Sequence, residues 1–161
     1  PVREGVGVTG SYSYAKSSLR PLELAARGGN AAAVQATRIP GLSGSVYNIT
    51  GYFERDGFQA RASYRYRSAF KGEVTQLFAV RGLTEILADD QLDAQIGYTF
   101  QPGSALEGLG ILFQVNNLTD SPYRTRLGVD GSGVKTADGS FLPETYETYG
   151  RQFLFGFSYR F

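Results

Sequence analysis

Apolar and polar side chains alternate without a break in the stretch Phe58-Gln-Ala-Arg-Ala-Ser-Tyr-Arg-Tyr-Arg67. In an extended strand, side chains two positions apart lie on the same face. One face of this stretch would therefore carry aromatic and alanine side chains, and the other would carry glutamine, serine and three arginines. The alternation predicts a β-strand with one apolar face and one strongly cationic face.

Five further stretches show the same alternation in stronger or weaker form. They are residues 5–17, 43–54, 91–100, 108–117 and the C-terminal stretch 153–161. The composition agrees with this pattern, because 21 Gly, 11 Tyr and 11 Phe favour strands and turns over helices. We therefore expect an all-β, antiparallel fold built on six strands.

The connections between these strands differ in length. Asp56-Gly57 and Pro102-Gly103 mark short turns, whereas residues 18–42, 68–90 and 124–144 form long polar connections. Short turns would lie at one end of the sheet and long loops at the other. A row of rings would follow the short-turn end, made of Phe53, Phe58, Tyr98, Phe100, Tyr159 and Phe161. This arrangement is typical of a transmembrane β-barrel.

A soluble β-sandwich or lipocalin-like barrel also has alternating strands and is the main alternative. The charges in mid-strand, the unequal loops and the aromatic C-terminus favour the membrane barrel. Six strands cannot close, because the smallest single-chain barrels have about 8 strands. Either the long loops hide further strands, or several chains share one barrel, or residues 1–161 are the C-terminal part of a longer barrel.

The composition also argues against several functions. A net charge of +1 gives no electrostatic case for a nucleic-acid partner. The absence of Cys and His removes the usual nucleophile, general base and zinc ligands. The only paired carboxylates, Asp89-Asp90, are adjacent and offer no acid/base geometry. We therefore expect no enzymatic activity, no cofactor and no metal.

The polar faces of two predicted strands carry the candidate functional charges. Arg61, Arg65 and Arg67 share one face of the first strand, and Asp93 and Gln95 share the polar face of the next. In a barrel these side chains would line the lumen. There they would pair with an internal domain or guide a solute, and we favour structural pairing over substrate contact.

Two segments near the C-terminus carry a family resemblance. Val115-Asn-Asn-Leu-Thr-Asp-Ser-Pro-Tyr123, then Tyr146-Glu-Thr-Tyr-Gly-Arg-Gln-Phe153 and the closing Phe-Ser-Tyr-Arg-Phe161, resemble the C-terminal end of TonB-dependent outer-membrane receptors. The positions that match the family pattern are Asn117, Leu118, Thr119, Asp120, Tyr123, Gly150, Arg151 and Phe153. The similarity is strongest over residues 109–161 and looser over 52–67.

The resemblance implies a bacterial outer-membrane barrel of about 22 strands with a plug domain inside it. Residues 1–161 would then be the C-terminal part of the barrel domain and supply its last six strands, with the plug domain and the TonB box absent. The whole receptor would import a scarce solute, such as a carbohydrate, a siderophore or a cobalamin. A small channel or adhesin barrel, and a soluble β-sandwich binding module, stay open as alternatives.

The resemblance also implies partners. These are outer-membrane lipid, the rest of the barrel and its plug, the barrel-assembly machinery, the TonB complex acting through the N-terminal part, and a small-molecule or oligosaccharide substrate. By analogy with the family, the assembly machinery would recognise the alternating aromatics of the last strand. Those residues are Phe157, Tyr159 and Phe161.

Overall fold

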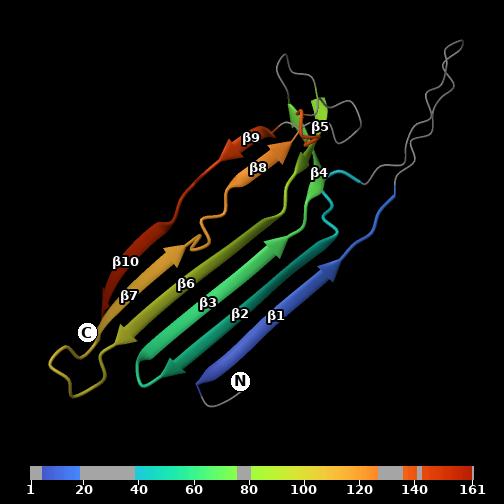
Figure 1. Ribbon diagram of the computed structural model, residues 1–161. Coiled ribbons are helices and arrows are strands. Elements are labelled where there is room, and N and C mark those ends of the chain that lie inside the picture. The colour runs from blue at the N-terminus through green and yellow to red at the C-terminus, as the bar shows by residue number, and fades with distance from the viewer. Residues whose placement is uncertain (1–4, 19–38, 76–80, 127–135, 141–142, 161) are drawn as a thin grey trace, which may run out of the picture.

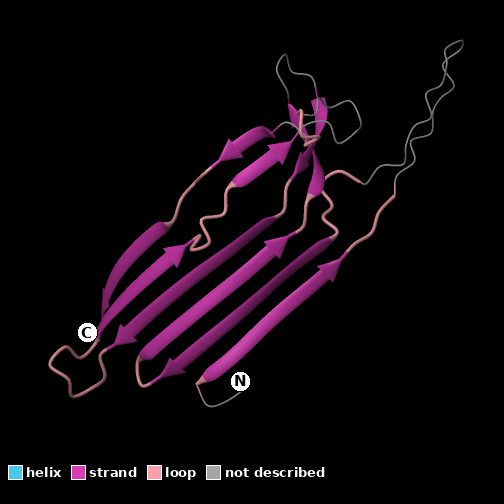
Figure 2. Ribbon diagram, viewed as in Figure 1, coloured by secondary structure: helices cyan, strands magenta, loops and turns pink. Residues whose placement is uncertain are grey.

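The computed structural model describes residues 5–18, 39–75, 81–126, 136–140 and 143–160, and its regular elements are all strands (Figure 1, Figure 2). The strands are β1 (Val6–Tyr14), β2 (Ser45–Arg55), β3 (Phe58–Arg67), β4 (Phe70–Thr75), β5 (Arg81–Ile86), β6 (Asp89–Thr99), β7 (Leu109–Asn116), β8 (Tyr123–Arg126), β9 (Pro143–Glu147) and β10 (Gln152–Tyr159). No helix that could cross a membrane occurs in this part of the chain.

The larger sheet contains six strands in the order β1-β2-β3-β6-β7-β10, and each neighbouring pair is antiparallel. These are the six strands that the alternation predicts. The prediction of an all-β, antiparallel fold is therefore confirmed. The strands lie side by side in one open sheet, with β1 and β10 at its two edges (Figure 1).

The short turn between β2 and β3 has the predicted form. Asp56 and Gly57 adopt positive φ angles of 49° and 82°. A side chain at Gly57 would also collide with the backbone carbonyl of Thr99 at the end of β6. Glycine is therefore required here both by the backbone conformation and by the close approach of the neighbouring strand.

Two of the long connections contain strands, which corrects the prediction of simple loops. Residues between β3 and β6 form β4 and β5, and residues between β7 and β10 form β8 and β9. These four strands make a second sheet in the order β4-β5-β8-β9, beyond the loop ends of the larger sheet (Figure 1). Most of the third long connection, residues 19–38, lies outside the described residues.

Polar side-chain contacts help to stabilise this smaller sheet. The side chain of Thr84 is fully buried, with its hydroxyl 2.9 Å from the carbonyl oxygen of Arg126 and 2.5 Å from a carboxylate oxygen of Glu144. Glu144 also accepts a hydrogen bond from Thr125 at 3.4 Å, and Arg126 forms an ion pair with Glu85. Strands of four to six residues held in this way need no apolar face.

The register of the larger sheet collects most of its apolar side chains on one face, with Val46, Leu112 and Leu154 as exceptions on the other. One row across the sheet joins successive partners Val6, Phe53, Ala60, Ile96, Phe113 and Phe155. Val115, at 8 % exposed, is the one hydrophobic side chain that the described residues bury, whereas Phe155 and Phe157 are 63 % and 69 % exposed. The hydrophobic residues of this sheet thus form a surface, which we call the apolar face.

Candidate functional site

The opposite surface, the polar face, brings the predicted lumen residues together. Arg61, Arg65 and Arg67 lie at alternate positions of β3, and Arg61 is the direct register partner of Gln95 on β6. Asp93 is the partner of Ser63, between Arg61 and Arg65. The two strands therefore place these five side chains on the same face of the sheet.

The three arginines of β3 have different surroundings. Arg67 donates to the hydroxyl of Ser43 at 2.6 Å and to the carbonyl of Gly41 at 2.8 Å, and its guanidinium lies 3.8 Å from the ring centroid of Phe70. Arg67 thus attaches the segment before β2 to the end of β3. Within the described residues, Arg61 and Arg65 form no hydrogen bond or ion pair, and both are exposed.

Asp93 has a structural contact at the end of the neighbouring strand. Its carboxylate accepts a hydrogen bond from the backbone N–H of Asn117 at 2.9 Å. The backbone N–H of the next residue, Leu118, donates to the carbonyl of Leu92 at 2.7 Å. Asp93 therefore helps fix the point at which the chain leaves β7.

Asn117 is the centre of a hydrogen-bonded cluster at that point. It is 5 % exposed and has a positive φ of 55°, a conformation that asparagine tolerates better than most residues. Its side-chain oxygen accepts from the backbone N–H of Ser121 at 2.9 Å and from the hydroxyl of Thr119 at 3.3 Å. Its side-chain nitrogen donates to the carbonyls of Gly150 at 3.1 Å and Ser121 at 3.4 Å. This one side chain joins the residues that follow β7 to those that precede β10.

Arg151 reinforces the same junction from the surface. Its Nε donates to the carbonyl of Leu118 at 2.9 Å, and its Nη1 lies 3.9 Å from the Asp120 carboxylate. Both charged side chains are nearly half exposed, so the ion pair contributes little, about 0–1 kcal/mol. The hydroxyl of Thr119 donates to the carbonyl of Asp90 at 3.2 Å. The motif residues up to Asp120, together with Gly150 and Arg151, therefore form one cluster, which we call the Asn117 junction.

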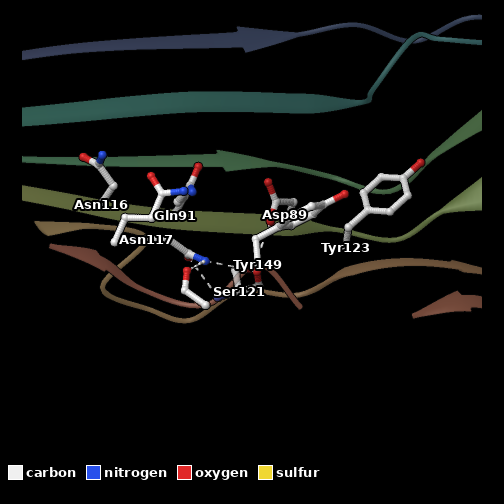
Figure 3. Close-up of a pocket in the computed structure, with 9 residues that line it drawn as sticks. Asp89, Gln91, Asn116, Asn117, Ser121, Tyr123 and Tyr149 are labelled. Atoms are coloured by element: carbon white, nitrogen blue, oxygen red, sulfur yellow. Dashed lines mark hydrogen bonds between the residues drawn. The ribbon is translucent and has the colours of Figure 1, made fainter. Parts of the chain in front are cut away.

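A polar pocket of about 250 Å³ lies beside the Asn117 junction (Figure 3). Its lining residues come from β6, β7, β8, β10 and the intervening loops, and are Asp89, Gln91, Asn116, Asn117, Ser121, Tyr123, Tyr149, Gly150 and Gln152. Tyr123, the last residue of the predicted motif, thus lines this pocket. The hydroxyl of Ser121 donates to the Asp89 carboxylate at 2.9 Å.

Tyr149 stands at the exposed side of the pocket. Its ring is 68 % exposed, and its hydroxyl donates to the carboxylate of Glu147. That hydrogen bond and the negative charge of Glu147 raise the pKa of the Tyr149 hydroxyl above its usual value. The tyrosine therefore stays neutral and its ring is oriented by a neighbour on the same chain segment.

No family model, no curated protein and no solved structure matches this chain. The described residues also contain no group of three or more Asp, Glu, His or Cys side chains that could hold a metal ion. The chemical character of the two faces and of the pocket is therefore the basis for a functional assignment.

The predicted assembly residues lie apart from the pocket. Phe157 and Tyr159 point to the apolar face, as partners of Ile111 and Leu109, and are 69 % and 59 % exposed. Phe161 lies outside the described residues.

Sequence reasoning missed most of the pocket. Asp89 and Gln91 are in phase with Asp93 on β6, so the alternation alone could have placed them on the polar face. Tyr149 and Gln152 reach the pocket only because β10 pairs with β7, a long-range contact that no local pattern specifies.

Proposed function

We propose that residues 1–161 form the C-terminal part of the β-barrel of a TonB-dependent receptor, a protein of the bacterial outer membrane that imports a scarce solute. The observation that carries this proposal is the exposed apolar face. Its aromatic side chains run across six paired strands, and the described chain offers nothing to cover them. Soluble monomers rarely expose a continuous apolar surface of this extent.

Lipid is the partner that best fits this face. Moving a fully exposed side chain the size of Phe157 from water into an apolar medium is worth about 1.5–3 kcal/mol. Several such residues side by side on β10, including Phe153 and Phe155, would make insertion strongly favourable. The charged side chains of Arg61 and Arg65, on the opposite face, would then lie inside the barrel.

The apolar face also has the banded pattern expected for a membrane barrel. Tyrosines gather toward the loop ends of β1, β2 and β3, and phenylalanine and tyrosine gather toward the turn ends. The row between them is small and aliphatic on the first five strands, Val8, Gly51, Ala62, Ala94 and Val115, and ends at Phe153 on β10. The loop-end band contains Tyr12, Tyr14, Tyr47, Tyr64 and Tyr66, and the turn-end band contains Phe53, Phe58, Tyr98, Phe100 and Tyr159.

The distance between the bands suits a bilayer. Phe58 and Tyr66 are separated by eight steps along β3, or about 27 Å at roughly 3.4 Å per residue. A strand tilt of about 40° reduces this to roughly 20 Å, close to the apolar band of about 25 Å in outer-membrane barrels. The open edges at β1 and β10 would pair with further strands, because unpaired backbone groups are costly in lipid.

The proposal assigns partners to the remaining surfaces. Arg61 and Arg65 would face the plug or the solute, and the rest of the barrel would pair with the two edges. Phe157, Tyr159 and Phe161 would be recognised by the barrel-assembly machinery. The TonB complex would act through the N-terminal part of the receptor.

Spin labels on adjacent residues of β6 test the assignment of the two faces. Residues 1–161 contain no Cys, so Ala94→Cys and Gln95→Cys each give a single labelling site in a full-length protein from which any Cys outside this stretch has been removed. We expect the label at position 94, on the apolar face, to be relaxed by oxygen, because oxygen concentrates in lipid. The label at position 95, on the polar face, should be relaxed by a water-soluble nickel reagent. Equal access of the nickel reagent to both labels, in a protein that stays in the soluble fraction, would contradict the proposal and favour a soluble β-sandwich.

A further inference from the structure

The polar pocket beside the Asn117 junction combines amide groups, tyrosine rings and a single carboxylate (Figure 3). We propose that this pocket is a binding subsite for one ring of an uncharged saccharide. The proposal rests on the proposed function, because in the receptor the polar face would line the solute path.

The amide side chains supply the hydrogen-bonding groups that sugar hydroxyls require. Gln91 on β6 and Gln152 on β10 form no side-chain hydrogen bond within the described residues. Asn116 uses its side-chain oxygen to accept from Gln114 at 2.8 Å, which leaves its NH₂ group for a ligand. An amide both donates and accepts, so it can satisfy a hydroxyl in either role.

Two aromatic rings flank these amides. Tyr123 and Tyr149 are 38 % and 68 % exposed. A tyrosine ring offers a rigid apolar surface against which the C–H face of a sugar ring can pack, and its hydroxyl stays at the polar edge. The bond from Tyr149 to Glu147 restricts the ring before any ligand arrives, which lowers the entropy lost on binding.

The charges of the pocket argue against an anionic ligand. Its one charged lining residue is Asp89, which is hydrogen-bonded to Ser121. Arg65 is the register partner of Gln91 on β3 but does not line the pocket. A phosphate or an anionic iron chelate would meet a carboxylate here without a lining cation to balance it.

The volume of the pocket limits the size of the ligand that it can hold. A volume of about 250 Å³ lies just below the range of roughly 300–1,000 Å³ that is usual for drug-sized ligands. The pocket therefore suits a single ring of an oligosaccharide, with the remaining rings outside it. A macrocycle such as a cobalamin is too large.

The pocket is held in shape by the Asn117 junction, which forms part of its lining. Asn117 is buried and hydrogen-bonded to both segments that border the pocket. The backbone segments that carry the binding groups are thus fixed in advance, so binding requires no rearrangement of these segments.

Calorimetric titration of the full-length, detergent-solubilised receptor tests the proposal. The probes are neutral oligosaccharides of glucose, xylose and N-acetylglucosamine, an oligogalacturonate as the anionic counterpart, and a ferric hydroxamate. We expect a neutral oligosaccharide to bind, and Gln91→Ala to weaken it about 3- to 10-fold, the loss of one neutral hydrogen bond. The matched control is Gln59→Ala on the same polar face, outside the pocket, which should leave the affinity unchanged.

Substitutions of Tyr149 separate ring packing from hydrogen bonding. Tyr149→Phe should retain most of the affinity for the neutral oligosaccharide. Tyr149→Ala should weaken this affinity by about the same factor as Gln91→Ala. Binding of only the anionic or iron-containing probes, or equal losses in Gln91→Ala and Gln59→Ala, would overturn the saccharide site. Absence of binding by every probe, in a protein that inserts normally in the outer membrane, would overturn this inference and leave the proposed function intact.

Discussion

The larger and the smaller sheet of this chain obtain their stability from different contacts. In the larger sheet, neighbouring strands of 8 to 11 residues pair over six to ten residues and place most apolar side chains on one face. In the smaller sheet, short strands meet around the buried hydroxyl of Thr84 and the carboxylate of Glu144. The larger sheet is thus defined by long strands with alternating side chains, and the smaller sheet depends on a few specific side-chain contacts.

The largest effect should come from the Asn117 junction, which fixes the end of the larger sheet. Asn117→Ala removes every side-chain hydrogen bond of that residue and places alanine at positive φ. We expect a loss of about 3–5 kcal/mol, since each abandoned buried group costs about 1–3 kcal/mol and a left-handed backbone costs a non-glycine residue about 1–2 kcal/mol. Urea unfolding of the full-length protein in detergent measures this loss.

Two variants make the Asn117 experiment specific. Asn117→Gly accepts the positive φ but makes no side-chain bonds, so it should be about 1 kcal/mol more stable than Asn117→Ala. Asn48→Ala on the polar face of β2 is the control, because Asn48 is exposed and makes no side-chain hydrogen bond in the described chain. An Asn117→Ala protein as stable as Asn48→Ala would show that the Asn117 junction does not contribute to the stability of the fold.

The next largest effect should distinguish the two faces of the larger sheet. Ala62 lies in the small-residue row of the apolar face, and Ser63 lies on the polar face beside Thr50. If the apolar face contacts lipid, Ala62→Arg should cost about 2–4 kcal/mol. Ser63→Arg should cost about 1 kcal/mol, the value of its hydrogen bond to Thr50.

Unfolding of both variants in lipid vesicles, compared with the unsubstituted protein, provides the measurement. Equal costs for the two arginines would mean that neither face is covered by lipid.

A smaller, local effect is expected in the smaller sheet. Glu144→Ala removes the carboxylate that accepts from Thr84 and Thr125, at a cost of about 1–2 kcal/mol. Hydrogen exchange should accelerate in β5, β8 and β9 and stay unchanged in β2 and β3. Glu147→Ala is the matched control, because Glu147 lies on the same strand but forms no hydrogen bond with Thr84 or Thr125. Faster hydrogen exchange in both sheets of Glu144→Ala would contradict the conclusion that different contacts stabilise the two sheets.

The smallest effect should be the loss of stability at acid pH in the turn before β9, which contains Asp138. Hydrogen bonds from Ser140 and Thr136 lower the pKa of the Asp138 carboxyl from 3.8 to about 2. Because the folded value lies below the unfolded one, its contribution is complete above about pH 4 and is lost as the pH falls toward 2. A carboxyl NMR titration should place the midpoint near 2 in the intact protein and higher in Thr136→Val, which loses one hydrogen bond to the carboxylate but keeps those from Ser140. Identical midpoints would show that the turn does not hold the carboxylate.

The sequence predicts the larger sheet well because alternation is a local signal. The alternation of apolar and polar side chains predicts β3 and β6, and Asp56-Gly57 predicts the turn between β2 and β3. The smaller sheet is harder to predict, because the alternation of β4 covers only six residues and has glycine at one apolar position, and β5, Arg81-Gly-Leu-Thr-Glu-Ile86, does not alternate.

The site is only partly predictable for a related reason. The resemblance selects Asn117, Gly150 and Arg151, but their contacts join residues more than thirty positions apart. Likewise, Asp93 is predicted on the polar face, yet its bond to the Asn117 backbone depends on how β6 and β7 are aligned. Residue types and phases are encoded locally, whereas partners across strands follow from the register.

Val115 is the one hydrophobic residue that the described part of the chain buries, and this has a consequence for how the protein is made. A chain with an interior core can collapse around it as soon as it is synthesised, and so shield its own hydrophobic groups. This sheet has almost no such interior, so the newly made polypeptide would be prone to aggregate in water until its apolar face is buried. If the protein is delivered to a membrane as proposed, its delivery would depend on a carrier that keeps the aromatic side chains apart, and overproduction beyond the capacity of that carrier would yield aggregates.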